Sequence, residues 1–153
     1  MILSRDGFPI AYDTRGAGAP ALVFVHGWSC DRAYWAEQLE PLSRRWRVVA
    51  VDLVGHGESG LGRTDWTIAS FGDDVAAVVE GLGLERVVLI GHSMGGDVIL
   101  EAARRLPGRV AGLVWVDVYT QLGTPRTPEE LRAFVDRFRA DFAPAVRGVP
   151  SWV

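Results

Sequence analysis

The chain has 153 residues with a net charge of −3, and 48% of its residues are hydrophobic. This composition supports one globular core and argues against binding to nucleic acid or to an anionic membrane. All 16 basic residues are arginines, and they are scattered rather than clustered as a phosphate site requires. The single cysteine, Cys30, excludes an internal disulfide framework. Because neither a signal peptide nor a membrane-spanning stretch is visible, we expect a cytoplasmic protein.

Short apolar runs separated by turn signals predict the strands. Ile2–Arg5 and Ile10–Asp13 flank Asp6-Gly7, a dipeptide that accepts positive φ in a tight hairpin turn. Val, Leu and Ile then dominate four runs without polar alternation, as in strands that are buried on both faces of a parallel sheet. These four runs are Ala21–Val25, Val48–Val51, Val87–Ile90 and Val110–Val116.

Helical periodicity fills the segments between these runs. Apolar residues recur at spacings of three and four in Thr67–Leu82. Asp31–Leu42 and Gly95–Leu106 are two further predicted helices, and Pro41 should disturb the last turn of the former. Alternating strands and helices predict an α/β fold, a three-layer α/β/α sandwich with a mostly parallel sheet.

Residues 120–153 differ in character from residues 1–119, so we expect two parts in the chain. A polar, proline-bearing segment precedes Thr127-Pro128-Glu129-Glu130, which predicts a capping box with proline at the first helical position. The predicted helix carries one apolar face. That face could line a pocket or pack onto the core, and the sequence leaves both alternatives open. Its members are Leu131, Phe134, Val135, Phe138 and Phe142.

The motif with the clearest chemistry is G-x-S-x-G, which directly follows the strand Val87–Ile90 and opens the helix Gly95–Leu106. A serine on so tight a strand-to-helix turn needs small neighbours, and a helix N-terminus favours a developing oxyanion. Ser93 is therefore the predicted nucleophile, against the alternative of a glycine-rich turn with an incidental serine. The motif is Gly91-His92-Ser93-Met94-Gly95-Gly96.

Two further loops follow earlier strands. His26-Gly27-Trp28 ends the strand Ala21–Val25, and we expect the backbone N–H groups of Trp28 and Met94 to form an oxyanion hole. We interpret His26 as a histidine that hydrogen-bonds this loop. The segment 52–59, Asp-Leu-Val-Gly-His-Gly-Glu-Ser, closes the strand Val48–Val51, and we interpret its Asp and His as loop architecture.

These three motifs in this order resemble the α/β-hydrolase superfamily, in particular bacterial esterases, lactonases and cofactor-free haloperoxidase-like perhydrolases. The resemblance covers residues 1–119, and residues 120–153 resemble the start of the cap inserted after the sixth strand. It implies a triad in the order serine, acid, histidine, which argues against His26 as the base. Asp117, at the end of the sixth strand, is a candidate acid. Ser93 argues against epoxide hydrolases and haloalkane dehalogenases, which carry aspartate at that position.

The histidine that the resemblance implies is absent, because His26, His56 and His92 all precede Ser93. We therefore expect an α/β-hydrolase fold truncated after its sixth strand and the start of its cap. Such a chain should expose an apolar strand edge and be essentially inactive alone.

The complete enzyme should hydrolyse a small carboxylic ester, lactone or thioester through an acyl-enzyme, without metal or organic cofactor. The alternatives are a perhydrolase, a non-catalytic small-molecule-binding protein or pseudoenzyme of this fold, and a subunit completed by another chain. The sequence leaves the oligomeric state open.

Overall fold

The computed structural model describes residues 1–118, 127–141 and 144, apart from the side chains of Leu3 and Ser4. The chain divides into two compact units, Met1–Tyr119 and Thr120–Val153. The interpretation of the second unit as the beginning of a cap stays a prediction.

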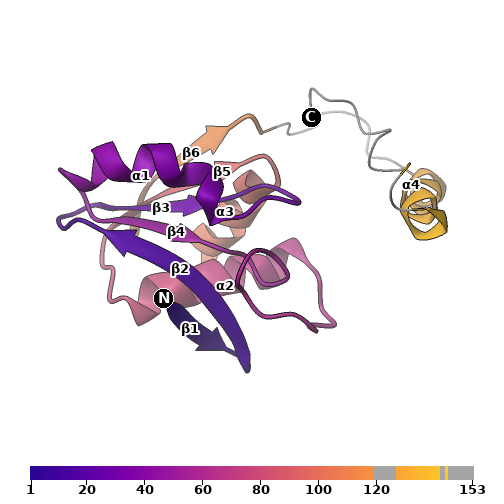
Figure 1. Ribbon diagram of the computed structural model, residues 1–153, viewed down its shortest axis with the longest axis horizontal. Helices are drawn as coiled ribbons and strands as arrows, with labels where there is room; N and C mark the ends of the chain where they lie inside the picture. Colours follow the sequence, from indigo (N-terminus) through magenta and orange to yellow (C-terminus); the bar gives the residue numbers. More distant parts are fainter. Residues whose placement is uncertain (119–126, 142–143, 145–153) are drawn as a thin grey trace. The chain divides into compact units, whose positions relative to one another are not determined.

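A six-stranded sheet forms the first unit, with the strand order β1-β2-β4-β3-β5-β6 (Figure 1). The strands β4, β3, β5 and β6 run parallel, and β2 and β1 extend the sheet antiparallel beside β4. The four apolar runs thus form the parallel part of the sheet, as predicted. The strands are β1 (Ile2–Arg5), β2 (Phe8–Arg15), β3 (Ala21–Val25), β4 (Val48–Val51), β5 (Val87–His92) and β6 (Val110–Val116).

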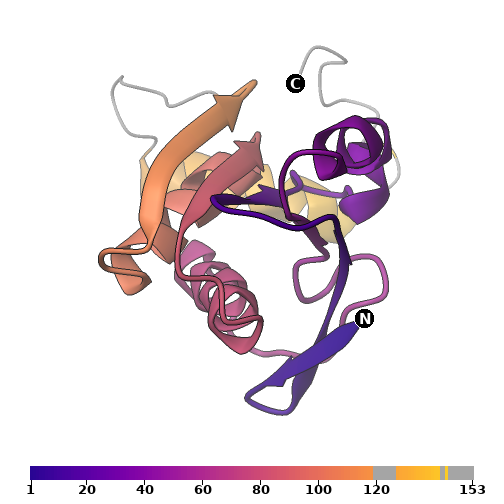
Figure 2. The same ribbon diagram turned by 90° about the vertical axis from the view of Figure 1, so that its left-hand side faces the viewer.

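Helices cover both faces of this sheet, which confirms the three-layer sandwich (Figures 1 and 2). On one face, α2 (Ile68–Gly81) and α3 (Met94–Arg105) bury a large apolar cluster that includes Val75, Val79 and Ile99. On the other face, a 3₁₀ turn η1 (Arg32–Trp35) leads into α1 (Ala36–Ser43), and together they bury Trp35 and Leu39. The predicted β-α-β order therefore gives two cores, one on each side of the sheet.

The local signals act as expected, with one correction. Asp6 and Gly7 both have positive φ, 52° and 82°, in the turn between β1 and β2. Thr67 caps α2 through a reciprocal pair of hydrogen bonds with Ser70. Pro41 does not disturb the last turn of α1, which continues past it to Ser43 although proline provides no N–H donor there. Pro41 itself is exposed, and the next residue, Leu42, packs against the apolar cluster that contains Trp35 and Leu39.

The sheet ends at β6, whose outer residues are exposed. Val114, Trp115 and Val116 expose 44%, 51% and 38% of their surface. The expectation of an apolar strand edge is therefore confirmed for the part of the chain that the structure describes. An edge of this kind offers unpaired backbone groups and apolar surface to another polypeptide.

In the second unit, α4 (Pro128–Ala140) begins at the predicted capping box of Thr127 and Glu130. Leu131, Phe134 and Val135 on this helix are exposed. Phe142 and residues 119–126 lie outside the described residues. Across the described ranges, every helix is too short or too polar to cross a lipid bilayer.

Candidate active site

Ser93 stands on a sharp turn between β5 and α3. Its backbone has φ 49° and ψ −121°, a region that a residue with a side chain rarely adopts. Two hydrogen bonds hold the turn: the Ser93 N–H donates to the Val116 carbonyl at 3.0 Å, and the Gly96 N–H donates to the Ser93 carbonyl at 2.8 Å. Ser93 is half-buried at the N-terminus of α3. A strained serine at a helix start matches the turn that the motif predicts.

The glycines on either side of Ser93 are required because a larger residue would clash with nearby backbone atoms. A Cβ atom at Gly95 would lie 2.6 Å from the carbonyl oxygens of both Val25 and His26. A Cβ atom at Gly91 would overlap the backbone of Gly95. Because backbone atoms cannot move aside as the end of a flexible side chain does, both positions exclude larger residues. Helix α3 therefore approaches β3 and β5 closely enough to present Ser93 at the end of the sheet.

The loop after β3 lies directly against this turn. A Cβ atom at Gly27 would lie 3.2 Å from the Cβ of Ser93 and 2.9 Å from Nδ1 of His92. The next residue, Trp28, is 48% exposed. The structure thus brings the His-Gly-Trp loop and the serine turn together, although they are far apart in sequence. Trp28 and Met94 each adjoin the contact, as the hypothesis of two backbone oxyanion donors requires.

His26 is completely buried beneath this loop. The Leu53 N–H donates to Nε2 of His26 at 3.0 Å, so Nδ1 carries the proton of the neutral ring and donates to the Gly27 carbonyl at 2.8 Å. Burial lowers the pKa of His26 below its ordinary value of 6.5, mainly because the charged ring would lose its hydration. Both ring nitrogens are occupied, which fits the interpretation of His26 as a histidine that binds the loop.

Asp52 and Arg32 hold the neighbouring loop. Asp52 is completely buried and accepts hydrogen bonds from the backbone N–H groups of Arg32 at 2.7 Å and Glu58 at 2.9 Å. The guanidinium of Arg32 also pairs with Asp52, Glu58 and Asp13. Sequence reasoning missed Arg32, because its partners lie between 19 and 26 residues away and no local pattern marks them.

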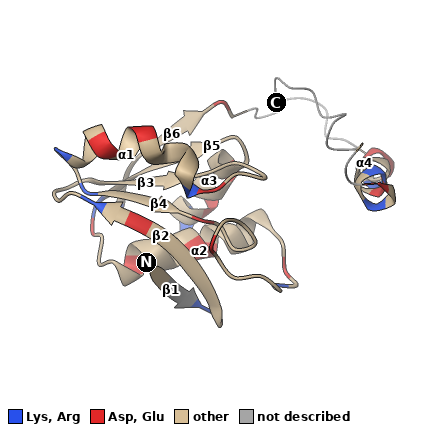
Figure 3. Ribbon diagram, in the orientation of Figure 1, with Lys and Arg blue, Asp and Glu red and all other residues tan. Residues whose placement is uncertain are grey.

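A second ion network supports the segment that leads to α2. Arg63 donates two hydrogen bonds to the buried Asp74, at 2.7 and 2.6 Å, and Arg5 donates a third at 2.9 Å. Hydrogen bonding to Asp74 raises the pKa of Arg63. Several arginines that look scattered in the sequence therefore meet acidic partners in the fold. Figure 3 shows the basic and acidic residues distributed over both layers of helices and the connecting loops.

Asp117 follows β6 and has a positive φ of 49°. Because Val116 pairs with His92 in the sheet, Asp117 comes next to Ser93 at the ends of adjacent strands. Its side chain is exposed. This position fits the candidate acid, and its role stays a prediction. The third histidine, His56, packs against His26 with ring centroids 5.0 Å apart and ring planes tilted by 55°.

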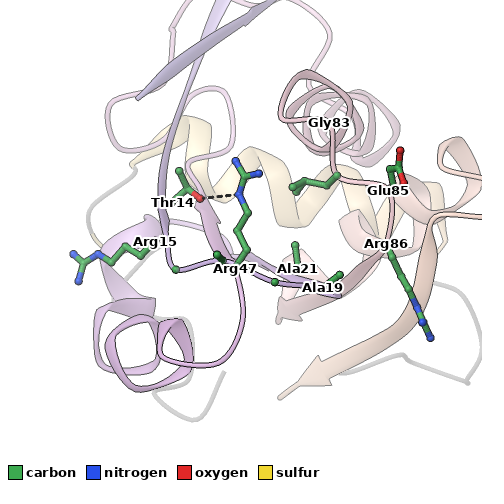
Figure 4. A pocket seen from close by; sticks show the side chains of 12 residues that line it. Thr14, Arg15, Ala19, Ala21, Arg47, Gly83, Glu85 and Arg86 are labelled. Carbon is green, nitrogen blue, oxygen red and sulfur yellow. Dashed lines mark hydrogen bonds between the residues drawn. The ribbon is translucent and has the colours of Figure 1, made fainter.

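Cavities occur at both ends of the parallel strands. One of about 190 Å³ lies beside the serine turn and is lined by His26, Tyr34, Trp35, Gln38, His92 and Val116. A larger hollow of about 670 Å³ lies at the opposite end, around the starts of β3, β4 and β5. In Figure 4 its three arginines, Arg15, Arg47 and Arg86, point away from one another. The larger hollow therefore lacks a convergent set of charged groups.

Comparison with known proteins agrees with this geometry. Residues 20–152 match the family described as alpha/beta hydrolase fold. A non-heme haloperoxidase from Rhodococcus erythropolis is 39% identical, over 91% of this chain and 52% of its own length. The solved structure of Est816, described as an N-acyl homoserine lactone degrading enzyme, superposes with a TM-score of 0.85 and 32% identity, covering 97% of this chain and 55% of that one. The solved structure of a thermophilic esterase from Thermogutta terrifontis superposes with a TM-score of 0.76 and 34% identity, and the match covers 92% of this chain and 52% of that one.

A strained serine turn at the C-terminal edge of a mostly parallel sheet, with a His-Gly loop against it, defines the α/β-hydrolase class. The chain belongs to the α/β-hydrolase family. It spans about half the length of the relatives above. These relatives include enzymes named for haloperoxidation, lactone degradation and ester hydrolysis, so the family alone leaves the reaction open.

Proposed function

We propose that Ser93 is the nucleophile of a serine hydrolase that cleaves a small carboxylic ester, lactone or thioester. The observation that carries the proposal is the contact between Gly27 and Ser93, because it places the His-Gly-Trp loop beside the serine. The residue after the serine, Met94, and the residue after Gly27, Trp28, then both lie next to this contact and each carries a backbone N–H group. Two such donors at the position of a developing oxyanion are what acyl transfer requires.

The proposed reaction begins when Ser93 Oγ attacks the carbonyl carbon and gives its proton to a general base. The carbonyl oxygen becomes an oxyanion and accepts hydrogen bonds from the N–H groups of Trp28 and Met94. Collapse of this intermediate expels the alcohol or thiol, which takes the proton, and leaves an acyl group on Ser93. Water then attacks the acyl group with the same base, and the carboxylic acid departs. Asp117 is the proposed acid that orients the base.

The base is proposed to come from a polypeptide segment outside these 153 residues. The three histidines of the chain have other contacts, since both ring nitrogens of His26 are hydrogen-bonded to backbone groups and the His56 ring packs against His26. His92 is packed against Gly27. The exposed edge of β6 is a surface where such a segment can pair. Without a base, Ser93 has the acidity of an ordinary alcohol and is a poor nucleophile.

The test uses the polypeptide encoded by the complete reading frame that contains this sequence. We expect Ser93→Ala to lower turnover of p-nitrophenyl acetate by on the order of 10³-fold or more, because the acyl-enzyme can no longer form. Ser43→Ala, a half-buried position at the end of α1, is the matched control and should keep full turnover. Equal turnover in wild type and Ser93→Ala would overturn the proposal.

A second candidate activity is perhydrolysis, in which hydrogen peroxide replaces water in the deacylation step. The relative named as a non-heme haloperoxidase, 39% identical over 91% of this chain, favours it. Both activities use the same acyl-enzyme and differ only in the second nucleophile. Peracid formation from an acetate ester and peroxide, compared with acid release at matched ester concentration, distinguishes them.

A further inference from the structure

The Gly27 carbonyl and the Trp28 N–H belong to the same peptide group. Because a peptide group is planar and trans, its C=O and N–H point in opposite directions. Whatever fixes the direction of the Gly27 carbonyl also fixes the direction of the Trp28 N–H. The orientation of the proposed oxyanion donor is therefore set from the far side of the loop, away from the substrate.

The group on that far side is the imidazole of His26. Its Nδ1–H donates to the Gly27 carbonyl at 2.8 Å, and the Cys30 N–H donates to the same oxygen at a longer 3.3 Å. The imidazole is itself held at Nε2 by the Leu53 N–H, 3.0 Å away at the end of β4. Leu53 is completely buried, and so is its neighbour Asp52, which is clamped by Arg32. His26 thus connects the Gly27–Trp28 peptide to a rigid part of the neighbouring loop.

We propose that His26 is a positioning residue that aims the Trp28 N–H at the oxyanion by holding the Gly27 carbonyl through Nδ1–H. The inference rests on the proposed function, because it needs the Trp28 N–H to serve the oxyanion. It assigns His26 a role in the transition state, beyond its contribution to folding. Only the Nδ1–H form of the ring performs it, because Nε2 has to stay free to accept from Leu53.

The surroundings of His26 favour this form. The ring is completely buried, so the neutral state is preferred, and the ring of His56 packs on it at 5.0 Å. Asp52 and Asp31 are the acidic groups that act on the ring, and their effect is smaller than that of burial. A neutral ring with one donor and one acceptor matches its two partners without leaving a buried polar group unpaired.

Three substitutions at residue 26 separate the two hydrogen bonds. His26→Asn keeps an amide donor close to the position of Nδ1, His26→Gln keeps an acceptor close to Nε2, and His26→Ala keeps neither. We expect His26→Ala to lower kcat by about 10²-fold with little change in KM, since a misdirected oxyanion donor weakens only transition-state binding. His26→Asn should regain most of that loss, and His26→Gln should resemble His26→Ala. Ser43→Ala, whose hydroxyl donates to the Glu40 carbonyl within α1, is the control and should keep kcat.

Thermal unfolding of each variant separates positioning from folding. A merely structural role predicts that kcat follows the loss of stability, with Asn and Gln equally impaired, and that result would overturn the inference. Ser93→Ala, assayed in parallel, tests the proposed function separately. If Ser93→Ala is inactive while His26→Ala keeps the wild-type kcat, the function stands and the positioning role is wrong.

The ring can also be observed directly if His26→Ala fails to fold. Long-range ¹H–¹⁵N correlation spectra of the wild-type protein should show the His26 proton on Nδ1 and an unprotonated Nε2. A proton on Nε2 would remove the donor to Gly27 and overturn the inference without any variant.

Discussion

The two ends of the parallel strands differ in how their polar groups are arranged. At the C-terminal end, backbone groups and buried side chains converge: the Ser93 turn, the Gly27 loop and the His26 imidazole are in mutual contact or joined by hydrogen bonds. At the N-terminal end, a hollow of about 670 Å³ is bordered by Arg15, Arg47 and Arg86, which diverge (Figure 4). The end of the sheet with the larger hollow is thus the one whose charged side chains do not point to a common site. The contact between the serine turn and the loop after β3, rather than cavity volume, identifies the candidate site.

The largest effect on stability should come from a side chain placed where α3 packs against the end of β3, next to Ser93. Gly95→Ala places a Cβ atom 2.6 Å from two backbone carbonyl oxygens, and we expect it to lower the free energy of unfolding by about 3 kcal/mol. Gly112→Ala is the matched control, because its Cβ would meet open space on β6 and should cost nothing. Urea unfolding of both variants is the measurement. Equal stabilities would show that the close approach of α3 to β3 is not needed.

A smaller effect should appear as a pH dependence of stability. His26 has a lowered pKa in the folded protein, so the unfolded chain binds a proton more readily as the pH falls below the ordinary value of 6.5. The contribution of the neutral His26 ring to the free energy of unfolding is therefore fully present above pH 6.5. It is lost as the pH falls from 6.5 towards the lowered pKa of the folded protein. The slope is at most about 1.4 kcal/mol per pH unit for one proton.

The check is the free energy of unfolding of wild type and His26→Asn measured from pH 8 down to pH 5, an interval chosen around the ordinary histidine pKa of about 6.5. The difference between the two proteins should be constant at high pH and shrink below pH 6.5. Parallel curves throughout the range would contradict the assignment of a buried neutral ring.

The smallest effect is expected at the opposite end of the sheet. Arg15→Ala and Arg86→Ala remove exposed guanidinium groups that border the large hollow, and each should change stability by no more than about 0.5 kcal/mol. Turnover of the ester should stay at the wild-type level in both variants. A marked loss of turnover in either one would show that the N-terminal end takes part in function and would break the contrast.

Much of the fold follows from local signals in the sequence. Apolar runs predicted β3, β4, β5 and β6, apolar periodicity predicted α2, and the capping box at Thr127 predicted the start of α4. The glycines of the serine motif already implied a tight strand-to-helix turn, since only small residues fit there. Periodicity and turn chemistry are properties of neighbouring residues, so a single sequence is enough to read them.

The polar networks could not be predicted in the same way. Arg32 meets Asp52 and Glu58, and Arg63 meets Asp74, through contacts that exist only once strands and loops are in place. The hydrogen bond between His26 and Leu53 likewise joins the ends of two strands. Pro41 shows a limit of a local rule, because α1 continues past this proline to Ser43.

The central claim is that Ser93 carries the acyl group during turnover. The most direct test is acid quenching of the complete polypeptide during reaction with an activated acetate ester, followed by mass spectrometry of its peptides. The account predicts an acetyl increment on the peptide that contains Ser93, and its absence in Ser93→Ala together with loss of turnover. Acetylation at a different residue during turnover, or undiminished turnover by Ser93→Ala, would contradict it.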